Sequence, residues 1–266
     1  DTLIGGTNSR GFNSANYLYG DAISAVDGFT AGNDSIVGGT NTGSIIYGDA
    51  YDATISTSGV TLTGGNDVIV VPGTNSTIYG DFDQIYVYTT GVTIKFGNDS
   101  ITGGNGDDNI YGDYSDVQFG EKILTGGDDT IAGGKGADWI YGGIGNDTFV
   151  YAQTSDSLTG LNLATAIGND TIIDFTSSLV GGNDHIVLSA TGFGLNYTAG
   201  TGFSDGSDFA VVATDSAVDG SSARIVFSQE TGVLYYNASS GATDYTALAT
   251  LNNVTNLAAS DFIIVT

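Results

Sequence analysis

Aspartate and glycine recur together in this chain, at spacings that place carboxylates in tight turns. Three stretches repeat a nine-residue pattern of glycines, an aspartate and a large apolar residue: GGNGDDNIY (103–111), GGKGADWIY (133–141) and GGIGNDTFV (142–150). Glycine allows positive φ in a turn, so successive carbonyl groups can point inward. Carboxylate and carbonyl oxygens are the ligands that Ca²⁺ takes in proteins. The pattern therefore predicts calcium-binding turns that lead into short strands.

Two shorter phrases extend the set of candidate ligands. One is G-[ND]-D followed by any residue and then a large apolar residue, and the other is IYGD or a variant of it. One turn offers fewer than the six to eight oxygens that Ca²⁺ takes, so each of several ions should bridge stacked turns. A metal-free solenoid held by Asn and Asp hydrogen bonds is the alternative. The candidate metal ligands are Asp34, Asp49, Asp67, Asp81, Asp99, Gly104, Gly106, Asp108, Asp113, Gly127, Asp129, Gly134, Gly136, Asp138, Gly143, Gly145, Asp147, Asp170 and Asp184.

The composition favours a cation partner and excludes several others. Thirty acidic residues face five lysine and arginine residues, for a formal net charge of −25. Such a surface repels nucleic acid, whose binding needs basic side chains to displace counterions. The chain has no cysteine, which excludes disulfides and thiolate metal sites. It has no apolar run of about 18 residues, so we expect no membrane insertion.

Residues for catalysis are scarce. His185 is the only histidine, which excludes zinc-protease motifs of the H-E-x-x-H kind. The stretch GFSDG (202–206) matches a nucleophile elbow, but no histidine follows it and no helix is indicated there. We therefore predict that the chain is not an enzyme.

Short strands separate these turns and must position them. Asp34 and Asp67 are 33 residues apart, and apolar strand centres follow at Ile36, Ile45, Ile55 and Leu62 before the pattern returns. The next intervals are 32 and 30 residues long. We predict that two strands make one coil of a parallel roll, so that each long repeat contains two coils. Tyrosines recur at the same period and should stack as a ladder: Tyr47, Tyr79, Tyr111 and Tyr141.

This register predicts two unlike edges. The G-[ND]-D and IYGD turns share one edge, which is rich in carboxylates throughout. The opposite edge is neutral at first and becomes acidic only at 103–108 and 133–138. Its neutral turns are GGTNTG (38–43), STSG (56–59), GTNS (73–76) and TTG (89–91).

The nonapeptides resemble the calcium-binding repeats of RTX (repeats-in-toxin) proteins. Residues 168–194 resemble the β-sandwich cap that follows such repeats. Residues 223–265 resemble the carboxy-terminal region recognised by type I secretion, and contain a hairpin with its turn at 230–232. The resemblance implies an all-β protein: a right-handed parallel β-roll solenoid over 1–150, then a β-sandwich-like carboxy-terminal cap and secretion-signal region over 151–266.

Two classes of function follow. The first is a structural protein at the exterior of a bacterium, in a surface layer, matrix fibre or adhesin, which folds on extracellular Ca²⁺ and self-associates into a lattice or filament. The second is the calcium-dependent folding and export module of a larger secreted hydrolase or toxin, with its active domain upstream of Asp1. The low lysine and arginine content and the neutral edge favour the first class. The start in mid-repeat and the secretion-like tail favour the second.

Overall fold

The computed structural model is all-β, with four sheets, and describes residues 2–4, 16–40, 43–151, 169–196, 203, 208–237 and 245–265. Sheet 1 contains, in spatial order, β1 (Thr2–Ile4), β4 (Ser35–Val37), β8 (Val68–Val70), β12 (Ser100–Thr102), β16 (Thr130–Ala132), β18 (Thr148–Tyr151), β20 (His185–Ser189) and β25 (Phe262–Val265). Sheet 2 contains β2 (Asn16–Tyr19), β5 (Ser44–Tyr47), β9 (Thr77–Tyr79), β13 (Asn109–Tyr111), β17 (Trp139–Tyr141), β19 (Asp170–Ile172), β24 (Tyr245–Leu251), β23 (Val233–Asn237), β22 (Ile225–Ser228) and β21 (Phe209–Val212).

Two smaller sheets and four short helical segments complete the described elements. Sheet 3 contains β3 (Ala22–Val26), β6 (Ala50–Ile55), β10 (Phe82–Val87) and β14 (Tyr114–Gln118). Sheet 4 contains β7 (Thr61–Thr63), β11 (Thr90–Lys95) and β15 (Glu121–Thr125). The helical segments are η2 (Ser178–Val180), α2 (Ala190–Phe193), η3 (Asp215–Gly220) and η4 (Ala259–Asp261). No helix in the described ranges is long and apolar enough to cross a membrane.

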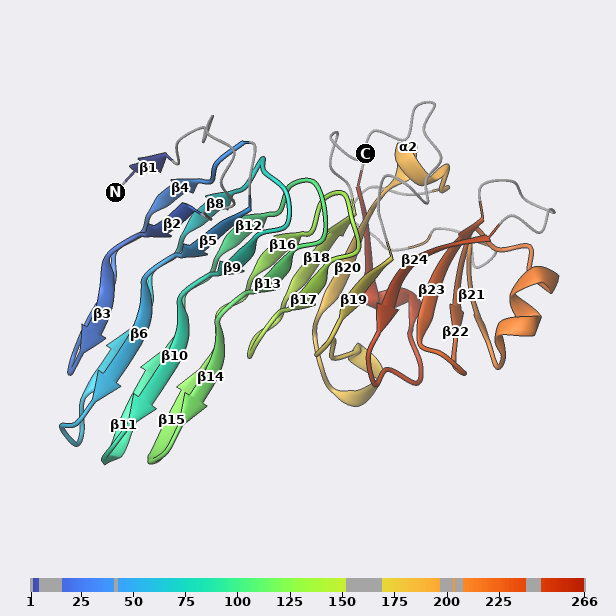
Figure 1. Cartoon of the computed structure of the whole chain (residues 1–266). Coiled ribbons are helices and arrows are strands. Elements are labelled where there is room, and N and C mark those ends of the chain that lie inside the picture. Colours follow the sequence, from blue (N-terminus) through green and yellow to red (C-terminus); the bar gives the residue numbers. More distant parts are fainter. Residues whose placement is uncertain are drawn as a thin grey trace.

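The parallel β-roll is confirmed, but the predicted coil size is wrong for the long repeats. β4, β5, β6 and β7 pass in turn through sheets 1 to 4, and β8 then pairs in parallel with β4. Each long repeat is thus one wide coil of four strands, stacked beside the next along the roll (Figure 1). A two-strand coil of the predicted kind runs from β16 to β18, where Ile131 lies beside Phe149, and the described strands β18, β19 and β20 again alternate between sheets 1 and 2.

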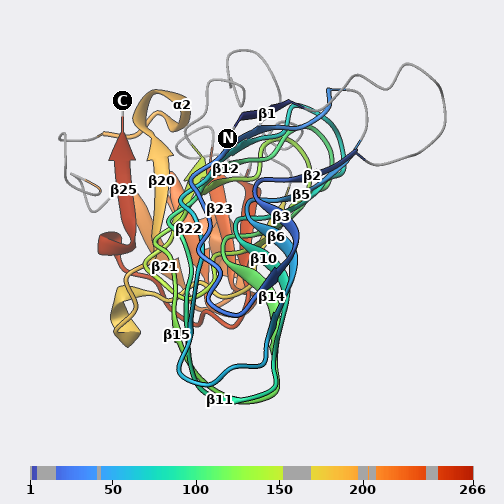
Figure 2. The same cartoon turned by 90° about the vertical axis from the view of Figure 1, so that its left-hand side faces the viewer.

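The wide coil arises because the two-residue corner Gly48–Asp49 between β5 and β6 does not send the chain straight back to sheet 1. β6 instead runs outward, and the chain reverses only after Ile55. Viewed along the roll, the wide coils superimpose and end in a closed tip (Figure 2). We call the part between sheets 1 and 2 the inner lobe, and the part between sheets 3 and 4 the outer lobe.

Each lobe has its own hydrophobic core. The inner core is a ladder of side chains from successive coils, and it continues without a break into the carboxy-terminal strands, from Ile36 to Ile264. The outer core is a separate cluster that includes Ile55, Phe82 and Ile94. Apolar residues that alternate along each strand supply both cores, as expected for strands with one buried face.

The predicted tyrosine ladder is confirmed on the outer surface of sheet 2. The rings of Tyr47, Tyr79, Tyr111 and Tyr141 stack with centroids 4.6 to 5.2 Å apart and planes within 11° of parallel. Tyr19 extends the ladder by one rung, 5.1 Å from Tyr47. Parallel in-register pairing places identical residues on adjacent strands and so produces this stack.

The carboxy-terminal strands extend the sheets of the roll. β20 and β25 add in parallel to sheet 1, and β19 and β24 add in parallel to sheet 2. The predicted hairpin is present as the antiparallel pair β22 and β23. Both sheets cross residue 150, and the division into domains 1–150 and 151–266 stays a prediction. The GFSDG stretch lies outside the described residues except for Phe203.

Candidate metal sites

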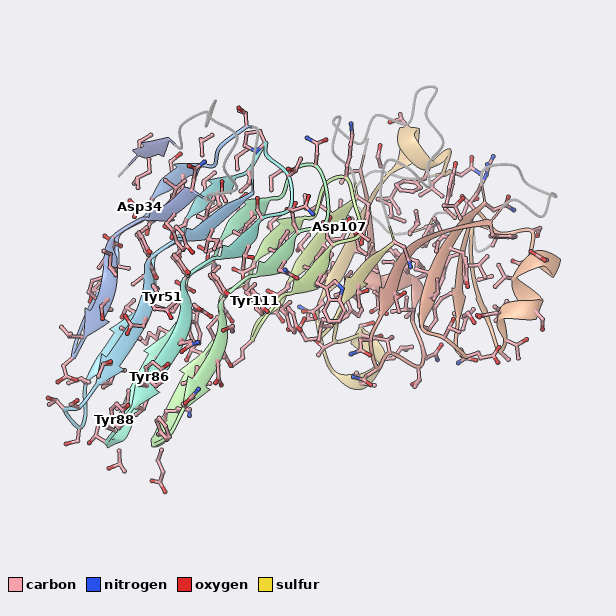
Figure 3. All side chains as sticks on the ribbon, in the orientation of Figure 1. Asp34, Tyr51, Tyr86, Tyr88, Asp107 and Tyr111 are labelled. Carbon is pink, nitrogen blue, oxygen red and sulfur yellow. The ribbon has the colours of Figure 1, made fainter. Side chains whose placement is uncertain are left out.

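The predicted acidic turns meet in the middle of each wide coil, where the two lobes join. Asp34, Asp67, Asp99 and their equivalents Asp129, Asp147 and Asp184 lie where the chain enters sheet 1, and all are buried. Asp49, Asp81 and Asp113 lie at the facing corners between sheets 2 and 3 and are also buried. We call this double column of carboxylates the seam. Asp34 marks its amino-terminal end in Figure 3.

The sequence predicted a single edge on which these turns alternate coil by coil, and this register is wrong. The G-[ND]-D turn and the IYGD turn belong to the same wide coil, and they face each other across the seam. Asp52, Asp83 and Asp116, which follow these corners in the sequence, lie within the strands of sheet 3. The error follows directly from the coil size. If each long repeat is taken as two coils, the two turns that face each other across one wide coil are placed on the same edge of successive coils.

Hydrogen bonds run along the first column of the seam from coil to coil. The amide of Asp67 donates to Oδ1 of Asp99 at 2.7 Å, and the amide of Asp99 donates to Oδ1 of Asp129 at 2.8 Å. The series continues from Asp129 to Asp147 at 3.0 Å and from Asp147 to Asp184 at 2.8 Å. Each carboxylate therefore uses one oxygen to hold the backbone of the preceding coil, which leaves Oδ2 for another partner.

The second column bridges the seam within a coil. Asp49 accepts a hydrogen bond from the amide of Gly65 at 3.1 Å, and Asp81 accepts one from Gly97 at 3.0 Å. Asp113 likewise accepts from Gly127 at 3.0 Å. These bonds tie the corner that leaves the inner lobe to the turn that returns to it.

The seam concentrates negative charge where water is excluded. Burial raises the pKa of Asp67 to about 7 and of Asp49 and Asp147 to about 8. Burial, reinforced by neighbouring carboxylates, raises the pKa of Asp81 and Asp99 well above the usual range. The five basic residues of the chain are far too few to neutralise these groups. The seam therefore requires protons or a metal cation.

The donor set of the seam fits calcium. The Oδ2 atoms of Asp67, Asp99 and Asp129 are buried and accept no hydrogen bond from the described residues. A Cβ on Gly80 would lie 2.1 Å from Oδ2 of Asp99 and 1.8 Å from the carbonyl oxygen of Gly112, so both oxygens crowd the same glycine. No three carboxylate or imidazole groups of the described ranges converge on one point. An ion here would take carboxylates together with carbonyl oxygens, a mixture typical of Ca²⁺.

A second ladder follows the turns between sheets 1 and 2, which we call the rim. The amide of Asp108 donates to Oδ1 of Asp138 at 2.8 Å, and the amide of Asp138 donates to Oδ1 of Asp170 at 3.0 Å. In the earlier coils serine replaces aspartate, and the amide of Ser44 donates to Oγ of Ser76 at 3.1 Å. The rim is therefore neutral in its first coils and acidic from Asp108 onward, as the sequence predicted for 38–43, 73–76, 103–108 and 133–138.

The other two neutral turns are not at the rim. Residues 56–59 and 89–91 lie at the tip of the outer lobe, between or at the starts of strands of sheets 3 and 4. The sequence predicted one neutral edge, whereas the structure has two separate rows of turns at opposite ends of the coil. Both rows lack carboxylates in these coils for different reasons: the rim has serine in place of aspartate, and the tip is remote from the seam.

The candidate glycines adopt two kinds of conformation. Gly106, Gly134, Gly136 and Gly143 have positive φ, as the nonapeptide pattern predicts. The others are not in the left-handed region, and close approach of the preceding coil is what requires glycine there. A Cβ on Gly127 would lie 1.5 Å from the carbonyl oxygen of Gly97, and Gly104 and Gly145 are similarly crowded.

Two carboxylates that are not among the predicted ligands lie at the ends of the second column: Asp21, which closes an IYGD-type phrase, and Asp174. Asp174 accepts hydrogen bonds from the amides of Gly142 and Gly143, both at 2.9 Å, and burial raises its pKa. Asp21 accepts a hydrogen bond from the amide of Gly32 at 2.7 Å. The signal was available, because each follows a strand of sheet 2 by two residues, as Asp49, Asp81 and Asp113 do.

Comparison with known proteins supports this assignment of the turns. The family model of the RTX calcium-binding nonapeptide repeat, in four copies, matches residues 95–113 and 124–158. The chain carries RTX calcium-binding repeats. These repeats bind calcium ions, and the parallel roll that contains them is an RTX β-roll. No curated protein matches the chain.

The gap between the two matched segments explains the wide coil. It covers residues 114–123, which form β14 and the start of β15 in the outer lobe. In the narrow coil an uninterrupted RTX turn, 142–147, joins β17 to β18. In the coil before it, the halves Gly112–Asp113 and 126–129 are separated by the outer-lobe strands yet meet again across the seam. The outer lobe is thus inserted into the RTX turn.

Contacts between the two coils support this equivalence. Oδ2 of Asp113 accepts a hydrogen bond from the amide of Ile144 at 2.8 Å. It also lies 2.4 Å from where a Cβ on Gly143 would be. Asp113 therefore stacks directly against the second glycine of the uninterrupted turn. Each split turn gains a carboxylate at that position, which compensates for the shortened glycine loop.

We expect calcium along the whole seam but at the rim only from Asp108 onward. The hydroxyl of Ser44 accepts a hydrogen bond from the amide of Gly39 and that of Ser76 accepts one from the amide of Ser44, but neither hydroxyl supplies charge. Anomalous scattering from crystals grown in calcium should show this asymmetry directly. Ions of equal occupancy at rim turns 38–43 and 103–108 would contradict it.

We also expect Asp129→Ala and Asp147→Ala to be non-additive. The two residues are 18 positions apart on adjacent rungs of the seam, where the amide of Asp129 contacts the carboxylate of Asp147. Their coupling in calcium-dependent melting should be about 0.5–3 kcal/mol, the range for residues that share a network. Asp138→Ala serves as the control because Asp138 belongs to the rim ladder. Strong coupling of Asp138 to Asp147, without coupling of Asp129 to Asp147, would contradict the assignment of seam and rim.

Proposed function

We propose that this protein is secreted and has a structural role at the exterior of a bacterial cell, in a surface layer, matrix fibre or adhesin. It would fold on extracellular Ca²⁺ and then self-associate. RTX repeat proteins are typically secreted by bacteria, which agrees with this location. The proposal assigns no catalytic role to this chain and no nucleic-acid partner, in keeping with its single histidine and its charge of −25.

The outer lobe is the observation that carries the proposal. A narrow coil of about 18 residues already contains both calcium turns of an RTX roll. The wide coils add strands with a second core, which the calcium turns do not need. This addition widens each face of the roll and makes β14 the edge strand of sheet 3 among the described strands. Extra surface of this kind is useful to a protein whose partners bind along its length.

Assembly in calcium tests the proposal. Sedimentation velocity and negative-stain electron microscopy should show ordered oligomers at millimolar Ca²⁺, the range of extracellular calcium modules. The same sample with Mg²⁺ in place of Ca²⁺ should remain unassembled. A folded monomer at every protein concentration tested would overturn the structural role.

The second candidate is a folding and export module for an upstream enzyme or toxin. The antiparallel pair β22 and β23 and the terminal strand β25 favour it, because they occupy the region that resembles a type I secretion tail. Export of an unrelated passenger fused before Asp1, through a type I secretion system, would support this candidate. Loss of export on deleting 223–266 is the matching control.

A further inference from the structure

The two faces of the roll differ in their exposed apolar side chains. The outer surfaces of sheets 2 and 3 form one face, which we call the aromatic face, and sheets 1 and 4 form the other. All exposed aromatic side chains of the described residues lie on strands of sheets 2 and 3 or directly after them: Tyr17, Tyr51, Tyr88, Phe119 and Trp139. The exposed large apolar side chains on the described strands of sheets 1 and 4 are aliphatic, among them Val68, Val70 and Ile123, whereas sheet 3 exposes Ile23 and Val26 beside its aromatic rings. In Figure 3, Tyr111 and Tyr51 lie near the junction of the two lobes, and Tyr86 and Tyr88 lie towards the tip of the outer lobe.

Rings near the tip are arranged with their planes nearly parallel. The centroid of Phe119 lies 5.4 Å from that of Tyr88 and 6.4 Å from that of Tyr86, with interplanar angles of 22° and 27°. Tyr88 is 64% exposed and Phe119 is 58% exposed. The ladder tyrosines cover one another's ring faces, whereas this cluster leaves ring surface open to solvent.

Phe119 is held outside the core at a cost in backbone strain. Its φ is 62°, in the left-handed region that a bulky side chain rarely adopts. Its equivalents in the two preceding coils, Ile55 and Val87, are completely buried in the outer core. Backbone strain at an exposed aromatic residue indicates a use for that ring on the surface.

The side chains between the rings are hydrogen-bonding, and the nearby ammonium of Lys122, on sheet 4, donates to the backbone carbonyl oxygens of Val117 and Phe119 at 2.9 and 2.8 Å. Asp52, Gln84 and Asp116 form one row across sheet 3, and Tyr86 and Gln118 pair in the next. The hydroxyl of Tyr86 donates to Oε1 of Gln84, and Nε2 of Gln118 donates to Oδ2 of Asp116 at 2.7 Å. The roll strands of sheets 2 and 3 contain no lysine or arginine.

We propose that the aromatic face binds a neutral polysaccharide. The face of an aromatic ring carries negative potential, against which the polarised C–H groups of a sugar ring pack well. Amide, phenol and carboxylate groups beside the rings can exchange hydrogen bonds with sugar hydroxyls. The roll strands of this face carry no basic residue, and the Lys122 ammonium is held by two backbone carbonyls, so the face is unsuited to sulfated, phosphorylated or carboxylated chains.

The shape and charge of the face favour this occupant over a second copy of the chain. The rings are spread over several coils of an open sheet, which suits an extended polymer rather than a small molecule. Two copies of the face would bring Asp52, Asp116 and their neighbours together and repel. The proposal does not depend on the structural role, because calcium-loaded monomer and assembled protein would both present the face.

Affinity electrophoresis in native gels tests this inference. Calcium-loaded protein is run through gels that contain a soluble neutral β-glucan, mannan or xylan, with alginate as the anionic comparison. At least one neutral polysaccharide should retard the protein, and alginate should not. Retardation by none of the neutral polysaccharides, or by alginate alone, overturns the proposal.

Phe119→Asn is the sharpest variant because it separates surface recognition from folding. Asparagine tolerates positive φ, so the variant should fold at the same calcium concentration and be at least as stable. Its affinity for the neutral polysaccharide should fall by about tenfold or more, as expected for loss of a central aromatic contact. Val68→Thr, on the opposite face, should leave the affinity unchanged.

Two results would assign the ring a different role. Equal retardation of Phe119→Asn and the unmodified protein would show that the cluster does not bind the polymer. The second result is slow migration of the unmodified protein in gels without polysaccharide, while Phe119→Asn migrates normally in the same gels. This result would show that a second copy occupies the face. Either result overturns the proposal, whereas a failure to assemble in calcium bears only on the structural role.

Discussion

Removal of calcium at neutral pH should unfold the roll, and acidification of the calcium-free protein should restore it. The seam places Asp49, Asp81 and Asp99 side by side without basic partners. Several ionised carboxylates in such a site oppose folding, since each buried unpaired ion costs several kcal/mol. Ca²⁺ removes this cost by replacing the repulsion with shared coordination, so metal binding and folding should be one transition.

The sign of the pH dependence should differ between the two forms. Burial raises the pKa of Asp67 to about 7 and of Asp147 to about 8, above the value of about 3.9 for an unfolded aspartate. The calcium-free fold therefore binds more protons than the unfolded chain, and its stability falls as pH rises through that range. In the calcium-loaded protein protons compete with the metal, so stability should instead fall as pH decreases.

Circular dichroism of dialysed protein in chelator, from about pH 5 to about pH 8, checks this expectation. The β-sheet signal should be present at the acidic end and lost at the alkaline end. About 1 mM Ca²⁺ should restore it at the alkaline end, given the affinity range of extracellular calcium modules. A β-sheet spectrum that survives in chelator at every pH would show that the seam is stable without metal.

Gly80→Ala should be one of the most damaging single substitutions in the seam. Its Cβ would lie 1.8 Å from the carbonyl oxygen of Gly112 and 2.1 Å from Oδ2 of Asp99. Both distances are shorter than a van der Waals contact. The carbonyl oxygen of Gly112 belongs to the backbone and cannot rotate away. The coils would have to separate just where an ion must bridge them. We expect a loss of more than about 3 kcal/mol, at the upper end of single-site effects.

Gly220→Ala is the matched control because no atom lies within 4 Å of its Cβ position. It should change stability by no more than about 0.5 kcal/mol, as for an ordinary surface substitution. Calcium titrations followed by circular dichroism would compare the two variants. A normal calcium midpoint for Gly80→Ala would contradict the close stacking of the Gly80 and Gly112 corners.

The calcium turns, the strands and the tyrosine ladder could be predicted because their causes are local. A glycine-rich turn with an aspartate is a pattern contained within nine residues, and the RTX calcium-binding repeat model matches it at 95–113 and 124–158. Alternating apolar residues place Ile36, Ile69 and Ile101 in the core whatever the size of the coil. In-register parallel pairing then stacks the tyrosines.

The coil size could not be predicted because the local pattern is the same for a narrow and a wide coil. Four short strands separated by turns can form two coils of two strands or one coil of four strands. Nothing within Gly48–Asp49 shows whether the chain reverses there. Long-range contacts decide it: the amide of Asp34 reaches the carboxylate of Asp67, 33 residues away, and the outer core forms its own cluster. The split of one RTX turn into two facing halves follows from that choice.

The sequence alone therefore determined the chemistry of this protein: Asp–Gly turns, short alternating strands and a charge of −25 that calls for calcium. Only the tertiary structure decided where that chemistry is gathered. It placed Asp49, Asp81 and Asp113 opposite the other column, formed the outer lobe, and turned Phe119 outward where Val87 is buried. The physical reason is that turn ligation and strand alternation are satisfied within a few residues. Coil closure depends on packing between residues about 30 positions apart.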